Sequence, residues 1–77
     1  MELLKVQNAN YVKDFVIQFR FNNGVEKDVN LEKELWGEIF EPLKDVNFFK
    51  KFKLNSWTIE WENGADFAPE FLYELVN

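Results

Sequence analysis

The sequence predicts a single α+β domain in which a small antiparallel sheet of about four to five strands carries its helices on one face. Apolar and polar residues alternate with a period of two in several segments, as expected of strands with one buried face. Asn-Gly turn signals separate some of these segments, and capping residues mark short helices between others. The predicted order over residues 1–77 is β-β-β-α-α-β-α.

Two strands are predicted in the first quarter of the chain, over residues 3–7 and 11–21. Within 11–21 the odd positions are mostly apolar and the even positions mostly polar, with Lys13, Val12 and Val16 as exceptions. Residues two apart on a strand share a face, so we expect one buried and one solvated face. The apolar face holds Tyr11, Phe15, Ile17, Phe19 and Phe21, and the polar face holds Asp14, Gln18 and Arg20.

An Asn-Asn-Gly turn signal separates this strand from a third strand at 25–31. A two-residue loop would place Phe19 opposite Asp28 and so mix an apolar face with a charged one. A three-residue loop, with its glycine in the left-handed conformation, instead places Ile17 opposite Val29. We therefore expect the three-residue loop.

Two short helices are predicted in the middle of the chain. Asn30 suits the N-cap of the first, over 31–36, because its side-chain oxygen can accept a hydrogen bond from a free backbone N–H group. Asp45 suits the N-cap of the second, which begins at Val46. Between them, Pro42 either breaks the chain or opens another short turn.

A last strand with a period of two over residues 53–61 (KLNSWTIEW), followed by Glu62, and a last helix complete the predicted fold. Pro69 fits the first position of that helix, because proline lacks the N–H group that would be unpaired there. The strand places Trp57 and Trp61 on the buried face and Glu62 on the polar one. The predicted buried sheet face comprises Phe15, Ile17, Phe19, Val29, Trp57, Ile59 and Trp61, and the opposite face comprises Gln18, Asp28, Thr58 and Glu60.

The residue inventory argues against catalysis. The chain contains no His and no Cys, so neither a Ser-His nor a Cys-His nucleophile pair can form. Its three glycines stand apart, so no glycine-rich phosphate loop is present. We expect a protein that is not an enzyme and that uses no cofactor.

Carboxylates are the remaining side chains that could bind a metal ion or act in acid/base catalysis. Glu60 and Glu62 share a predicted strand face and, with Asp66, can supply oxygen ligands to a metal ion or an acid/base pair. The segment between Glu62 and Asp66 lacks the close ligand spacing of a calcium loop, so we expect no metal site. Asp66, three residues before Pro69, is instead expected to accept hydrogen bonds from backbone N–H groups in the turn or at the start of the last helix.

The net charge of −5 arises entirely in the C-terminal quarter, because acids and bases balance over residues 1–59. Such a field attracts basic proteins and repels phosphate backbones, so we expect a protein partner with a basic surface and no direct binding to nucleic acid. Trp36 and Phe40 are candidates for exposed aromatic contacts. The candidate partner-binding residues are Glu60, Glu62, Glu70, Glu74 and Phe67. The alternative is that these acids only keep the domain soluble.

Several absences bear on location. The first ten residues lack the basic and apolar regions of a signal peptide, and no run of about 18 apolar residues occurs. The lack of Cys also removes any disulfide framework. We expect a cytoplasmic protein with no membrane association, and homo-oligomerisation stays open.

The C-terminal segment TIEWENGADFAPEFLY, together with FNNG and IFEPLKD, resembles a small bacterial family known as domain of unknown function 2442. The resemblance covers nearly the whole chain as one domain, and it departs from the family pattern at Glu62, where the family commonly has Pro, and in a shorter 53–57 segment. The motif residues, which we expect to be structural, are Trp61, Asn63, Gly64, Asp66, Pro69, Glu70, Leu72 and Tyr73.

The resemblance implies an α+β fold of undefined biochemistry. It also implies an interaction or regulatory module, such as the antitoxin-like member of a bacterial two-gene pair of the toxin-antitoxin kind. The alternatives that stay open are a carboxylate-based metal-binding protein and a purely structural or oligomerising domain.

Overall fold

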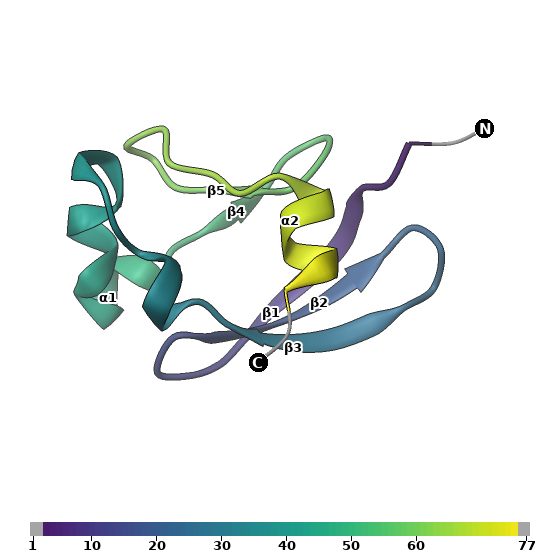
Figure 1. Ribbon diagram of the computed structural model, residues 1–77, viewed down its shortest axis with the longest axis horizontal. Coiled ribbons are helices and arrows are strands. Elements are labelled where there is room, and N and C mark those ends of the chain that lie inside the picture. The colour runs from purple at the N-terminus through teal and green to yellow at the C-terminus, as the bar shows by residue number, and fades with distance from the viewer. Residues whose placement is uncertain (1–2, 76–77) are drawn as a thin grey trace.

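The computed structural model describes residues 3–75 and shows a small α+β fold (Figure 1). The strands are β1 (Val6–Lys13), β2 (Val16–Phe21), β3 (Glu26–Asn30), β4 (Lys53–Leu54) and β5 (Ile59–Glu60). The helices are the 3-10 helices η1 (Glu32–Glu34) and η2 (Glu38–Lys44) and the α-helices α1 (Val46–Phe49) and α2 (Pro69–Glu74).

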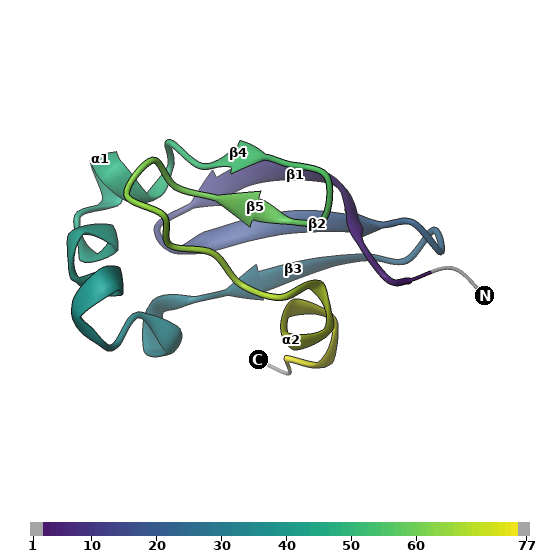
Figure 2. The same cartoon turned by 90° about the horizontal axis from the view of Figure 1, so that it is seen from above.

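The strands form two antiparallel sheets, one of order β1-β2-β3 and a two-stranded one of β4 and β5. Figures 1 and 2 show β4 and β5 over one face of the larger sheet, with α2 on the same side next to β3. The 3-10 helices and α1 gather at one end of the molecule (Figure 2). The core lies between these layers, and the other face of the larger sheet carries exposed residues such as Gln18 and Asp28.

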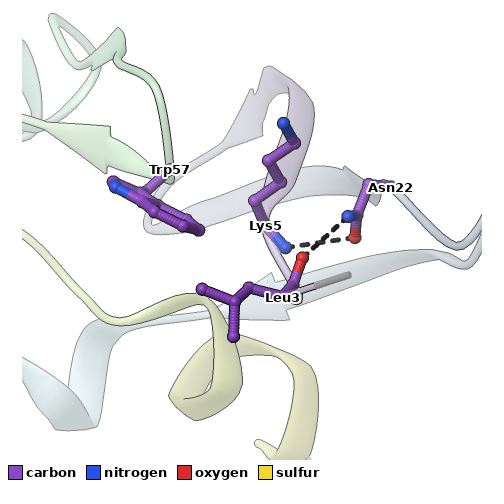
Figure 3. Close-up of a pocket in the computed structure, with 4 residues that line it drawn as sticks. All are labelled: Leu3, Lys5, Asn22 and Trp57. Atoms are coloured by element: carbon purple, nitrogen blue, oxygen red, sulfur yellow. Dashed lines mark hydrogen bonds between the residues drawn. The ribbon is translucent and has the colours of Figure 1, made fainter. Parts of the chain in front are cut away.

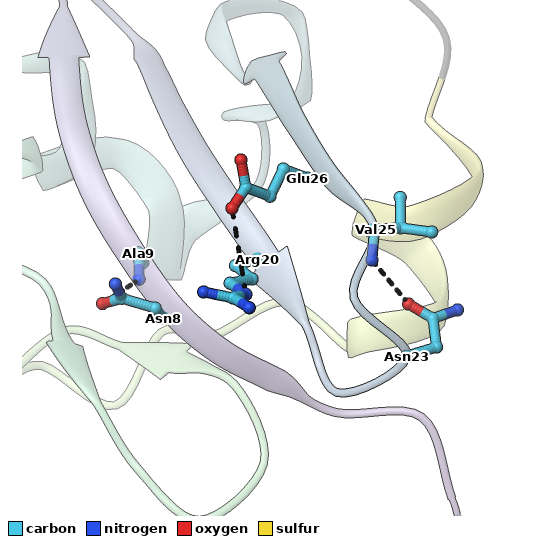
Figure 4. Close-up of polar contacts among 6 residues, drawn as sticks. All are labelled: Asn8, Ala9, Arg20, Asn23, Val25 and Glu26. Atoms are coloured by element: carbon cyan, nitrogen blue, oxygen red, sulfur yellow. Dashed lines mark hydrogen bonds and ion pairs between the residues drawn. The ribbon is translucent and has the colours of Figure 1, made fainter.

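The predicted hairpin register is confirmed. Ile17 pairs with Val29, and both side chains are buried. The N–H group of Phe21 donates to the carbonyl of Val25 at 2.8 Å, which closes a three-residue loop, and Gly24 within it has a φ of 89°. Figure 4 shows another hydrogen bond of the loop, from the Val25 N–H group to Oδ1 of Asn23, and the Arg20–Glu26 ion pair across the strands.

The prediction of one strand over 11–21 is wrong, because the chain turns at Asp14 and Phe15. Lys13 pairs with Val16 across this turn, so β1 runs from Val6 to Lys13 and overlaps the predicted strand at 3–7 only in its first two residues. Asp14 has a φ of 45°, a conformation that Asp tolerates better than most residues. The apolar alternation continues through the turn, so periodicity alone did not reveal it.

One of the two predicted helix caps is present, and the helices are shorter than expected. The prediction that Asn30 is an N-cap is wrong, because Leu31 takes that position in η1 and no side chain caps it. Oδ1 of Asn30 still accepts a hydrogen bond from the Glu32 N–H group at 3.0 Å, and one 3-10 turn follows instead of a helix over 31–36. The Asn47 N–H group donates to Oδ1 of Asp45 at 3.0 Å and so caps α1. Pro42 lies inside η2 and does not break it.

The prediction of one extended strand over 53–61 is wrong, because this segment is a hairpin with the two short arms β4 and β5. Oδ1 of Asn55 accepts hydrogen bonds from the N–H groups of Trp57 and Thr58, each at 2.7 Å, so the chain turns there instead of extending. Trp57 is consequently 48% exposed, and the prediction that it joins the buried face is wrong. Thr58, predicted on the polar face, is 5% exposed and donates its hydroxyl to the carbonyl of Phe67.

The remaining members of the predicted core are placed as expected, with Phe15 half-buried. Tyr11 is exposed, although its ring still meets Phe49 edge-on. Trp61 lies at the centre of the core, where its ring N–H group donates to the carbonyl of Phe49 at 2.7 Å. The fully buried core side chains are Ile17, Phe19, Phe21, Val29, Leu31, Leu43, Phe49, Ile59, Trp61 and Leu72.

A lysine from the sheet holds the last helix in place. Nζ of Lys27 donates to the carbonyls of Tyr73 and Leu75, both at 2.7 Å. These carbonyls lie at the C-terminal end of α2, where the helix has free acceptors and a partial negative charge. Tyr73 adds an edge-on ring contact with Phe21, so α2 is fixed against the first hairpin.

Candidate functional site

The turn at 61–65 has the same geometry as the first hairpin turn at 21–25. In each, the N–H group of the first residue donates to the carbonyl of the fifth, and the Asn side chain accepts from the N–H group two residues on. Gly64 has a φ of 91°, close to that of Gly24. Glycine is preferred at such positions because other side chains are strained there.

The side-chain amide of Asn63 connects this turn to a segment that is distant in the sequence. Its Nδ2 donates to the carbonyl of Ile39 at 2.9 Å, which connects the 61–65 turn to η2. Phe40 follows Ile39, and Phe67 follows the turn. The contact therefore brings Phe40 and Phe67 together, and they form one wall of the candidate site.

A groove with a volume of about 370 Å³ lies next to Phe40 and Phe67. We call it the aromatic groove, and its lining residues are Glu34, Trp36, Phe40, Asp66, Phe67, Ala68 and Phe71. Its volume lies near the lower end of the range for ligand sites. Trp36 is 74% exposed, whereas tryptophan side chains in folded proteins are on average highly buried.

Three phenylalanine rings form a stack along the groove. Phe67 lies in the middle, 4.9 Å from Phe40 and 5.5 Å from Phe71 between ring centroids, and the Phe67 and Phe71 rings are nearly parallel at 9°. Trp61 meets Phe67 edge-on at 6.0 Å, which joins the stack to the core. Phe71 at the outer end is 39% exposed, so it presents aromatic surface to solvent.

Two carboxylates line the groove beside these rings. Glu34 is half-buried and Asp66 is exposed, and within residues 3–75 neither forms an ion pair. The expected capping of α2 by Asp66 is wrong, because Ala68 is the N-cap and no side chain caps the helix. The backbone of Asp66 instead bridges to Glu60, which directs this part of the chain along β5.

The candidate partner-binding residues differ in their exposure. Glu62, Glu70 and Glu74 are exposed, whereas Glu60 is half-buried and accepts a hydrogen bond from Nδ2 of Asn55 at 3.2 Å. Phe67 is only 7% exposed, so the expectation that it is an exposed aromatic is wrong.

Of the two other aromatic candidates, Trp36 is exposed as expected, and Phe40 is half-buried. The sequence reasoning did not find Glu34 or Phe71 as site residues. Neither has a local pattern that indicates a site, because the groove forms only when three separate segments meet.

The motif residues of the C-terminal segment lie mostly in structural positions. Trp61 and Leu72 are buried, and Pro69 opens α2 at its first turn. The hydroxyl of Tyr73 accepts a hydrogen bond from Nδ2 of Asn23 at 3.3 Å. Asp66 and Glu70 are the exceptions, since their side chains are exposed and form no hydrogen bond or ion pair within the described residues.

Two smaller hollows differ from the aromatic groove in chemistry. The first, of about 160 Å³, is lined by Leu3, Lys5, Asn22 and Trp57, and Asn22 hydrogen-bonds the backbone on both sides of Leu4 (Figure 3). The second is lined by Phe15, Glu32, Leu35 and Lys44. Each contains one aromatic side chain and one cationic side chain, so neither combines an aromatic stack with uncompensated carboxylates.

No group of three or more His, Cys, Asp or Glu side chains within residues 3–75 is arranged to hold a metal ion. In the same range no helix has the length and apolar character needed to cross a membrane.

Comparison with known proteins gives one match. Residues 6–77 match the model of a family described as "Protein of unknown function (DUF2442)", which covers nearly the whole chain. Neither the curated proteins nor the solved structures contain a match to this chain.

Proposed function

Because the chain belongs to the DUF2442 family, whose description assigns no activity, we propose from the geometry that it is a protein-binding module whose contact surface centres on the aromatic groove. The observation that carries the proposal is the exposure of Trp36 at the groove, 74% of its surface. Tryptophan is among the residues most enriched at the energetic centres of protein interfaces.

The surroundings of Trp36 support this role. Large exposed apolar groups cost free energy in water, and an exposed Trp next to a half-exposed Phe71 forms a continuous apolar surface that a partner can cover. The stack of Phe67 and Phe71 connects to Trp61 in the core, so the ring contacts support the phenylalanine side of the surface before binding. A preformed surface loses less conformational entropy on association.

The charge of the domain favours a basic partner. Glu34 and Asp66 line the groove, and the exposed Glu62, Glu70 and Glu74 add negative charge elsewhere in the C-terminal region. Such a field speeds association with Lys- and Arg-rich surfaces and weakens as salt is added. It opposes binding to nucleic acid, because phosphate backbones carry the same sign of charge.

A regulatory form of this proposal is an antitoxin-like protein of the bacterial cytoplasm that covers a basic nuclease surface on its toxin. The resemblance to a family whose members often lie in two-gene arrangements motivates this form. The carboxylates of the aromatic groove suit a basic active-site surface. A carboxylate-based metal site and a purely oligomerising role are the competing functions, and both predict that Trp36 is dispensable for binding another protein.

The test compares two exposed tryptophans. We expect Trp36→Ala to weaken association with the partner purified from the native cell by about 30-fold or more, as for a residue at an interface centre. Trp57→Ala is the matched control, because Trp57 is also exposed but lines a different hollow. Surface plasmon resonance at two salt concentrations gives both rates.

The proposal also predicts that the association rate of the wild-type protein falls as salt increases. Equal affinity of the wild-type protein and Trp36→Ala, with a loss of affinity in Trp57→Ala, would place the contact surface elsewhere.

A further inference from the structure

We propose that the aromatic groove binds an arginine side chain of the partner, whose guanidinium stacks on the exposed ring faces and pairs with Glu34 and Asp66. The inference rests on the proposed function, since it names the chemical group that the groove recognises. It follows from two features that this groove combines: an aromatic stack with an exposed end and two carboxylates that form no ion pair within residues 3–75.

The ring stack provides flat surface for a planar cation. Phe67 and Phe71 lie nearly parallel, and the outer ring, Phe71, is 39% exposed. The indole of Trp36 adds the ring type that binds cations best, at the same groove. A cation over an aromatic face is attracted by the ring quadrupole, and a guanidinium also gains from parallel stacking.

The two carboxylates give the groove its charge preference. Within residues 3–75 the ion pairs join Arg20 to Glu26 and Lys44 to Glu41, so neither Glu34 nor Asp66 is neutralised by a neighbouring cation. Apolar rings next to the carboxylates lower the local dielectric when a partner covers them, which strengthens a charge pair formed there. An incoming cation therefore gains more at this groove than at an isolated surface carboxylate.

The geometry favours arginine over lysine. An ammonium group is compact and strongly hydrated, so it loses more solvation when it lies against aromatic rings. A guanidinium is planar, less strongly hydrated, and can donate two parallel hydrogen bonds to one carboxylate while its face contacts a ring. The aromatic groove contains both parallel rings and carboxylates, so it suits the stacking and the hydrogen bonding of a guanidinium at the same time.

The test uses three blocked heptapeptides that are identical except at the central residue, which is arginine, lysine or citrulline. Citrulline keeps the shape of arginine and removes the charge. Binding is followed by NMR on the full-length protein, whose three tryptophans each give one indole N–H signal. Trp36 reports the groove, Trp57 reports an exposed site outside it, and the buried Trp61 reports the core.

We expect the arginine peptide to shift the Trp36 signal in a saturable manner and to leave the Trp57 signal unchanged. The lysine peptide should bind several-fold more weakly, and the citrulline peptide should cause no shift at the same concentration. The double variant Glu34→Gln, Asp66→Asn should weaken the arginine peptide by about tenfold. Glu70→Gln is the matched control, because Glu70 is exposed but does not line the groove.

The outcomes separate this inference from the proposed function. If Trp36→Ala abolishes partner binding but about 10 mM arginine peptide leaves the Trp36 signal unmoved, the arginine inference is wrong and the contact surface stands. If the arginine peptide binds as expected but the partner binds Trp36→Ala normally, the proposed function is wrong. Equal shifts by the arginine and citrulline peptides would overturn the charge recognition.

Discussion

Trp61→Ala should lower the free energy of unfolding by about 3 to 5 kcal/mol, which is a large part of the stability of a domain this small. Trp61 is buried and contacts Phe49, Phe52 and Phe67 through its ring. Removing it leaves a cavity next to these three rings and also removes the contact that supports Phe67 in the aromatic groove. Urea denaturation monitored by circular dichroism measures the change.

A second variant at this position separates packing from hydrogen bonding. Trp61→Phe keeps most of the ring but leaves the carbonyl of Phe49 without its donor, which should cost about 1 to 3 kcal/mol beyond the smaller loss of packing. Trp57→Ala is the control, because Trp57 is half-exposed and its loss should cost far less. Similar losses in Trp61→Ala and Trp57→Ala would contradict the arrangement of the second hairpin.

Phe19→Ala should cost a comparable amount, about 3 to 5 kcal/mol. Phe19 is fully buried in the central strand, where Lys27 lies opposite and Phe21 lies 6.3 Å away between ring centroids. Gln18→Ala is the matched control, since Gln18 is the adjacent residue and points to the exposed face. Its loss should change stability by no more than about 0.5 kcal/mol.

The same denaturation experiment measures both variants. If Gln18→Ala is as harmful as Phe19→Ala, the two faces of β2 have been assigned wrongly. A difference of several kcal/mol between neighbouring positions supports a sheet with one buried and one solvated face.

The sequence predicted the parts of the fold that depend on local chemistry. The register of the first hairpin followed from matching Ile17 to Val29, because a shift by one residue would have moved every side chain to the wrong face. Asp45 and Pro69 were correctly placed at the starts of helices, since capping and proline geometry act within a few residues.

The errors occurred where a side chain redirects the backbone without changing the hydrophobic pattern. The turn at Asp14 lies within an uninterrupted alternation, so two strands looked like one. Asn55 turns the chain by accepting hydrogen bonds from Trp57 and Thr58, and this reverses the expected exposure of both. Neither residue propensity nor hydrophobic periodicity indicates such side-chain hydrogen bonds.

The aromatic groove could be predicted only in part. The exposure of Trp36 and the negative charge of the C-terminal region were expected from the sequence, but the groove itself was not. It needs the Asn63 contact with the carbonyl of Ile39, which connects segments 24 residues apart and places Phe40 on Phe67. Stacking also explains why Phe67, expected to be exposed, is buried.

The central claim is that a partner covers Trp36, and solvent accessibility of the indole N–H groups tests it without any substitution. A soluble nitroxide broadens NMR signals in proportion to their exposure. In the free protein we expect broadening of the Trp36 and Trp57 signals and a sharp Trp61 signal. Addition of the purified partner should protect Trp36 and leave Trp57 broadened. Protection of Trp57 with no change at Trp36 would contradict the account.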